Sequence, residues 1–148
     1  MPVVTPGRVL EAARRIGLPT LEVQIQPENA TLVNFDTIFF AHPQQFGRTI
    51  QLLGYRVDVV ATPSLYRWSF GDGAVTTTDN PGAPYPAKDI VHKYTDAHVT
   101  QHPRVDVTYH VRFRVDGGPW RDIDEPITAD GPATALQIKE ATPVLSGG

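Results

Sequence analysis

The stretch Tyr66-Arg67-Trp68-Ser69-Phe70-Gly71-Asp72-Gly73 decides how the rest of the chain is interpreted, because an alternating aromatic run ends there in a turn. Residues two apart in an extended strand point to the same face of a sheet, so Tyr66, Trp68 and Phe70 are predicted to enter one core. The Asp-Gly pair that follows supplies the side-chain-to-backbone bonding and the left-handed backbone that a reversal needs. The stretch therefore predicts a β-strand that ends at a tight turn.

Strand-like alternation continues on both sides of this stretch. The clearest example is 105–115, where every odd position is apolar and every even position is polar, which is typical of a strand with one face in the core. Residues 54–63 also alternate, and Pro63-Ser64 is expected to link them to the aromatic stretch. Earlier in the chain, 21–26 alternate, and 31–41 form a second apolar, extended segment.

The remaining segments are predicted from their turn residues. Asp116-Gly117-Gly118 is expected to close a hairpin whose returning arm is 119–123. Residues 74–88 are rich in Thr, Gly, Pro and Asp, and are expected to form a long surface connection. Residues 127–134 are predicted to be a loop, and 135–144 a last strand.

One helix is predicted over residues 5–17. Thr5 suits the N-terminal cap, Pro6 the first helical position and Gly17 the C-terminal stop. The side chains expected to form its apolar stripe are Val9, Ala12, Ala13 and Ile16. We expect this helix to cover one edge or end of a sheet.

Composition limits the class of protein. The chain has 148 residues, with 41% hydrophobic and 20% charged side chains, which suits a globular domain with a real core. A net charge of −3 argues against a nucleic-acid partner, and the absence of cysteine removes disulfides, thiol catalysis and cysteine-type zinc sites. No apolar run approaches the ~20 residues of a membrane span, so no membrane insertion is expected in this segment.

These observations predict an all-β fold, an antiparallel β-sandwich with one short N-terminal helix. Residues 1–46 are predicted to be an N-terminal extension of helix and strands that packs on the sandwich, because Ile38-Phe39-Phe40 needs a core to enter. Residues 47–148 are predicted to be the sandwich domain with a C-terminal tail.

Two motifs together suggest a family. Trp68-Ser69-Phe70-Gly71-Asp72-Gly73, followed by His92-Lys93-Tyr94, resembles the signature of a PKD (polycystic kidney disease) domain, over roughly residues 47–140. The sequence departs from that pattern in a proline-rich connection between the motif halves and in about twenty residues before the last strand. The structural motif residues that the resemblance implies are Trp68, Phe70, Gly71, Asp72, Gly73, His92 and Tyr94.

The resemblance implies an immunoglobulin-like sandwich of the kind found in actinobacterial surface or secreted proteins. Such modules serve as spacers, as adhesion or protein-contact units, or as accessories to secreted hydrolases, and are not catalysts. The resemblance therefore implies an extracellular or cell-surface location. If the protein is secreted, its signal peptide is expected to precede the given sequence.

Two places in the sequence carry side chains that could bind a metal ion. Asp72 could bind Ca²⁺ with Asp79 or Asp89, but a turn aspartate that accepts backbone N–H bonds is the favoured interpretation. His98 and His102 would share one face of a helix and could hold zinc, yet their flanks are not helical, and solvated loop histidines are favoured. No metal and no cofactor are predicted.

No catalytic residue is predicted either. The chain has no Gly-x-Ser-x-Gly nucleophile motif. The acidic residues Asp122, Asp124 and Glu125 are expected to lie in a solvated, exposed turn and not to act as a glycosidase pair. A Lys–Asn or Lys–Asp isopeptide crosslink is a minor alternative that would use one of the three lysines, Lys88, Lys93 or Lys139.

For ligand contact the candidates are the aromatic residues expected to face solvent, Trp120 and Tyr85, although capping of one end of the sandwich is favoured for Trp120. The leading hypothesis is a non-catalytic structural or protein-interaction module with a protein or cell-wall partner. The alternative is a carbohydrate-binding accessory of a secreted hydrolase, with a polysaccharide ligand. A metal-dependent enzyme is a third hypothesis, which metal bound to the purified protein would favour.

Overall fold

A computed structural model describes residues 3–140. Its helix is α1 (Pro6–Ile16). Its strands are β1 (Gln24–Gln26), β2 (Ala30–Leu32), β3 (Thr37–Phe40), β4 (Phe46–Leu52), β5 (Tyr55–Ser69), β6 (Val75–Thr78), β7 (Val91–His92), β8 (Val99–Gln101), β9 (Arg104–Val115), β10 (Arg121–Ala129) and β11 (Leu136–Lys139).

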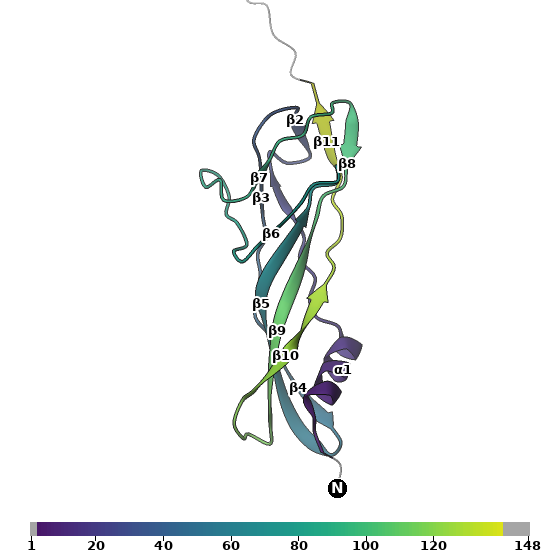
Figure 1. The fold of residues 1–148 in the computed structure, drawn as a ribbon, viewed down its shortest axis with the longest axis vertical. Coiled ribbons are helices and arrows are strands. Elements are labelled where there is room, and N and C mark those ends of the chain that lie inside the picture. The colour runs from purple at the N-terminus through teal and green to yellow at the C-terminus, as the bar shows by residue number, and fades with distance from the viewer. Residues whose placement is uncertain (1–2, 141–148) are drawn as a thin grey trace, which may run out of the picture.

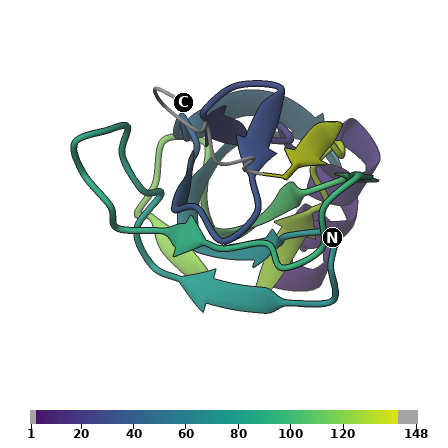
Figure 2. The ribbon, with the colours of Figure 1, turned by 90° about the horizontal axis from the view of Figure 1, so that it is seen from above.

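The strands form three sheets. The largest has the order β10-β9-β5-β4, with β6 paired to the second half of β5, and the two smaller sheets are β1-β3-β7 and β2-β11-β8. All pairings are antiparallel except that of β2 with β11. The molecule is elongated along β5 and β9 (Figure 1), and the view along its length shows the strands around a common interior (Figure 2). The predicted all-β sandwich with one short helix is confirmed.

The core follows the predicted alternation. Tyr66, Trp68 and Phe70 are all buried, with Trp68 completely inaccessible. The odd positions of β9 from Val105 to Phe113 are also fully buried, and β9 pairs with β5 over almost its whole length. The paired strands β5 and β9 therefore supply the middle of the largest sheet, and each turns one apolar face into the core.

Helix α1 begins and ends where predicted. The Arg8 amide donates to the Thr5 hydroxyl (3.2 Å), and Gly17, with φ +85°, donates its N–H to the Ala13 carbonyl (3.0 Å). The helix packs near β10 (Figure 1). One member of the predicted stripe is wrong, because Ile16 is exposed and Leu10 is buried in its place.

Three predicted connections are wrong in part. Pro63-Ser64 is no link between strands, because β5 continues through it with a register shift between Pro63 and Leu65. The segment 74–88 contains β6, which pairs with β5. The predicted loop 127–134 begins as strand, since β10 runs to Ala129 with a register shift between Ile123 and Ile127.

The N-terminal strands pair with strands from later in the chain. The predicted segment 31–41 is two strands separated by a turn in which Asn34 has φ +59°. Of these, β3 pairs with β7 and β2 pairs with β11. The division into 1–46 and 47–148 stays a prediction. The end of the predicted last strand, 141–144, lies outside the described residues.

Over residues 3–140, no helix has the length and apolar character needed to cross a membrane.

Candidate functional site

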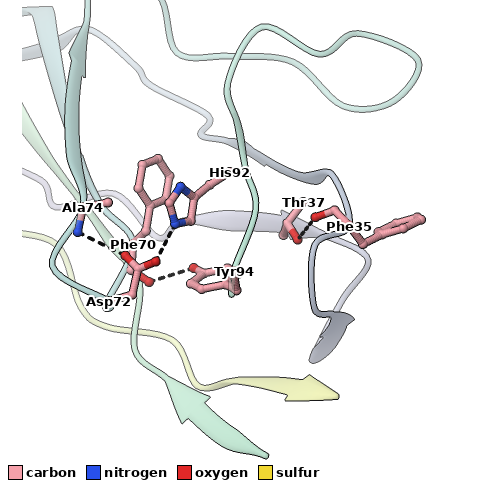
Figure 3. Close-up of polar contacts among 7 residues, drawn as sticks. All are labelled: Phe35, Thr37, Phe70, Asp72, Ala74, His92 and Tyr94. Atoms are coloured by element: carbon pink, nitrogen blue, oxygen red, sulfur yellow. Dashed lines mark hydrogen bonds and ion pairs between the residues drawn. The ribbon is translucent and has the colours of Figure 1, made fainter. Parts of the chain in front are cut away.

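The turn after β5 brings Asp72 and His92 together. One carboxylate oxygen of Asp72, Oδ1, accepts a hydrogen bond from the Ala74 amide (3.1 Å), as expected for a turn aspartate. The other, Oδ2, lies 2.7 Å from Nε2 of His92, which follows twenty residues later (Figure 3). Asp72 therefore joins the turn after β5 to strand β7. In the sequence, only the resemblance to the family motif relates these two segments.

Aromatic contacts surround this pair, and we call Phe70, Asp72, His92 and Tyr94 the Asp72–His92 cluster. The rings of Phe70 and His92 stack with centroids 4.2 Å apart, and Tyr94 meets His92 edge-on at 4.8 Å. The Tyr94 hydroxyl donates to the Phe70 carbonyl at 2.7 Å, and Figure 3 shows the two residues side by side although they lie 24 residues apart in the sequence. The cluster thus ties the end of β5 to the segment after β7.

The charges of the cluster are set by burial and hydrogen bonding. Burial by itself raises the pKa of the Asp72 carboxyl, but hydrogen bonds from His92 and from the Ala74 amide outweigh it, so the pKa lies below its usual value. Burial, with a smaller contribution from the Asp72 charge, raises the pKa of the Tyr94 phenol well above its ordinary value. Tyr94 is therefore a neutral hydrogen-bond donor over the whole physiological pH range.

This arrangement favours a structural role for the cluster. A His–Asp pair can activate a nucleophile, but the hydroxyl of Tyr94, whose ring meets His92 edge-on, is already donated to a carbonyl. Both oxygens of Asp72 have partners, and no group of three or more His, Cys, Asp or Glu side chains gathers anywhere in residues 3–140. Gly71 is needed because a Cβ there would lie 2.8 Å from the His102 amide nitrogen.

A surface groove lies elsewhere, beside the sheet β1-β3-β7. It has a volume of about 650 Å³, within the usual range of ligand sites. We call it the Phe35–Tyr85 groove, because these two aromatic side chains are 50% and 70% exposed. The residues that line it are Gln26, Pro27, Glu28, Asn34, Phe35, Asp36, Ile38, Tyr85, Lys88 and Lys93.

Local structure explains how the two rings are presented. Phe35 follows Asn34 in the turn between β2 and β3, and its ring points away from the Asp72–His92 cluster (Figure 3). Tyr85 lies in the loop between β6 and β7, which projects sideways from the body in both ribbon views (Figures 1 and 2). The Tyr85 amide donates to Oε1 of Gln26 at 2.7 Å, so this loop is anchored to β1.

Ion pairs connect Asp36, in the turn that carries Phe35, to Lys88 in the same loop and to Lys93 just after β7. Nζ of Lys88 lies 3.4 Å from Asp36 Oδ2, and Nζ of Lys93 lies 3.7 Å from Oδ1. All three side chains are more than one-third exposed, so the pairs are screened and contribute little to stability. They link the two sides of the groove but add little to the free energy of unfolding. A crosslink at either lysine would need a buried carboxylate, and Asp36 is not buried.

Of the two predicted ligand-contact residues, only Tyr85 lines the groove. Trp120 is 39% exposed and lies at the other end of the molecule, before β10. The guanidinium carbons of Arg112 and Arg114 lie 4.9 and 4.7 Å from its ring centroid. These cation–π contacts occupy ring surface that a stacked ligand would need, so Trp120 is a poorer candidate than Tyr85.

The other residues considered for chemistry lie apart from both places. His98 pairs with Glu140 (3.1 Å) at the start of β8, and the extended backbone of β8 overturns the helical spacing that a zinc pair with His102 would need. The acidic residues were predicted to lie in an exposed turn, and that prediction is wrong about the turn. The residues Asp122, Asp124 and Glu125 are exposed but lie on strand β10. There Asp122 contacts His110 and Glu125 contacts Arg14, both on the surface.

Sequence reasoning missed most of the groove. Phe35 belongs to the segment 31–41, which the sequence predicts to be one extended apolar stretch, and Gln26 ends a predicted strand with no sign that it lines a groove. A local signal was present, because Asn34 and Asp36 on either side of Phe35 are turn-forming residues. A turn there would place the ring outside the sheet. No local pattern in the sequence indicates that the loop around Tyr85 packs beside β1 and the turn that carries Phe35.

No protein-family model matches this chain, and comparison with curated proteins also gives no match.

Proposed function

We propose that this chain is a non-catalytic binding module whose Phe35–Tyr85 groove holds a partner. The observation that carries the proposal is the exposure of two aromatic side chains on the two sides of one groove. Large aromatic side chains that stay in contact with water contribute little to the stability of the fold, and aromatic residues are among those that most often anchor binding partners.

The rest of the described chain supports a scaffold role. The groove is formed by the turn before β3 and the loop before β7, and both are attached to paired strands. The one His–Asp pair inside the fold, that of the Asp72–His92 cluster, is packed against Phe70 and Tyr94. A rigid β framework that presents loops is the usual basis of binding in all-β modules.

We further propose that the module is a PKD-like, immunoglobulin-like domain of a bacterial surface or secreted protein. The support is the contact between the two halves of the motif, since Asp72 of the first half meets His92 of the second at 2.7 Å. A protein or cell-wall partner is the natural ligand for a module at such a location.

Binding to cell envelopes tests the proposal. The labelled protein is mixed with isolated actinobacterial envelopes and sedimented, and the wild type is expected to appear in the pellet. The double variant Phe35→Ala/Tyr85→Ala should remain in the supernatant. Leu65→Ala is the matched control, because Leu65 is similarly exposed (44%) on β5 but does not line the groove. Equal sedimentation of the double variant and the wild type would rule out the groove as the binding surface.

Melting temperatures of all variants should agree within a few degrees, because both rings are largely exposed and few contacts are lost. The competing hypothesis of a metal-dependent enzyme is checked separately by elemental analysis of the purified protein. A stoichiometric transition metal would favour that hypothesis over ours.

A further inference from the structure

We infer that the partner held by the Phe35–Tyr85 groove is an uncharged glycan, bound by stacking of sugar rings on the two aromatic side chains. This inference rests on the proposed function, because it assigns a ligand class to the same groove.

The charges of the groove cancel. Its lining contains two acidic and two basic side chains: Glu28, Asp36, Lys88 and Lys93. Both lysines already lie beside Asp36. An anionic ligand such as a nucleic acid or an acidic peptide would have to compete with that carboxylate, and a cationic ligand would meet the lysines. A ligand without charge has neither cost.

The polar groups offer both donors and acceptors. Gln26 uses Oε1 to accept from Tyr85, so the hydrogens on its Nε2 are not used in that bond. Each lysine ammonium carries three N–H groups, and only part of that capacity is directed at Asp36. Asn34 and Glu28 add further oxygens to the lining. A sugar hydroxyl is both a donor and an acceptor, so a polyhydroxylated ligand matches such a mixture.

The two rings provide the apolar part of the site. Tyr85 and Phe35 have flat faces of the size of a sugar ring, and 70% and 50% of their surfaces are accessible. They come from two separate loops attached to different strands. The two rings therefore offer two apolar faces on which sugar rings can stack.

Peptide ligands fit this site less well. An extended peptide would add to a free strand edge, but the edges of the adjacent sheet are β1 and β7, with three and two residues. A helical peptide needs a continuous apolar strip several turns long. The exposed apolar side chains of this groove are those of Phe35, Tyr85 and Pro27, since Ile38 is buried, and they come from separate turns and loops instead of one helix-length strip.

Native gel electrophoresis in gels containing soluble polysaccharides tests the inference. The neutral probes are β-1,3-glucan, hydroxyethyl cellulose, xylan, mannan and glycogen, and hyaluronan is the anionic comparison. We expect at least one neutral probe to retard the wild type, with little change between about 0.05 and 0.5 M NaCl because no ionic contact is involved. Hyaluronan should not retard it.

The variants locate the binding. Tyr85→Ala and Phe35→Ala should each weaken retardation about tenfold, as truncation of an interface anchor does. Tyr85→Phe should preserve it, because the ring face remains. Leu65→Ala should behave like the wild type. Retardation that is lost in Trp120→Ala but not in the groove variants would overturn the inference by placing the site at the other end of the molecule.

The remaining outcomes separate this inference from the proposed function. If no neutral probe retards the protein while envelopes still bind it through the groove, the glycan inference is wrong and the proposed function stands. Loss of envelope binding after protease treatment of the envelopes has the same meaning, because the partner is then a protein. If the groove variants have no effect in either assay, both proposals are wrong.

Discussion

The hydrogen bond from Tyr94 to the Phe70 carbonyl leads to a quantitative prediction for Tyr94→Phe. The hydroxyl and carbonyl oxygens are 2.7 Å apart, and the tyrosine is 1% exposed. Removing the hydroxyl leaves a buried carbonyl that water cannot reach, and an unsatisfied buried group of this kind costs about 1–3 kcal/mol. The ring itself remains, so its contact with His92 is kept. We therefore expect the free energy of unfolding to fall by about 1–3 kcal/mol.

Urea denaturation followed by tryptophan fluorescence measures this loss, since Trp68 lies fully buried in the same fold. In thermal unfolding the decrease should be about 2–4 °C for each kcal/mol in a chain of this size. Tyr85→Phe is the matched control, because Tyr85 is 70% exposed and should tolerate the change within about 0.5 kcal/mol. If Tyr94→Phe were as harmless as Tyr85→Phe, the view that this bond ties β5 to the segment after β7 would be wrong.

Three further predictions concern the turn after β5 and two glycines. Because the pKa of Asp72 is lowered in the folded state, its stabilising effect should be complete above about pH 5 and decrease as the pH falls below about 4. The difference in unfolding free energy between wild type and Asp72→Asn should accordingly shrink between pH 5 and pH 3, and a constant difference would contradict the role of the carboxylate. Gly131→Ala should destabilise by about 2 kcal/mol or more, since its Cβ would clash with the Val105 carbonyl oxygen and must displace backbone; normal stability on denaturation would refute this. Gly7→Ala lies in α1, where a Cβ would have no neighbour within 4 Å. It should instead raise the free energy of unfolding by up to about 1 kcal/mol and the melting temperature slightly, and a lower melting temperature would contradict the helix assignment.

Elements with a strong local pattern could be predicted from sequence. Helix α1 has its cap, its first-turn proline and its terminal glycine within the thirteen residues from Thr5 to Gly17, and its observed ends agree with them. The sequence of strand β9 alternates without exception from Val105, and its odd positions to Phe113 are fully buried, although Asp106 on the other face is buried as well. In both cases the information lies in neighbouring residues, because a helix cap and a strand face are local properties.

Irregular strands could not be predicted in the same way. Proline at position 63 suggested the end of a strand, yet β5 passes through it by shifting register against β9. A similar shift in β10 hid the strand that continues to Ala129. A register shift changes which residues face the core, so a periodic pattern appears to stop although the pairing continues. Whether the strand continues past such a shift depends on its pairing with the neighbouring strand.

The Asp72–His92 cluster and the Phe35–Tyr85 groove also combine local features with contacts between distant segments. The sequence by itself determined that Tyr66, Trp68 and Phe70 enter a core and that a turn follows, because side-chain alternation and turn chemistry depend on adjacent residues. Only the tertiary structure decided that Asp72 shares its carboxylate with His92, and that Phe35 and Tyr85, fifty residues apart in the chain, flank one groove. Contacts between distant segments depend on strand pairing and loop placement, which no local pattern encodes.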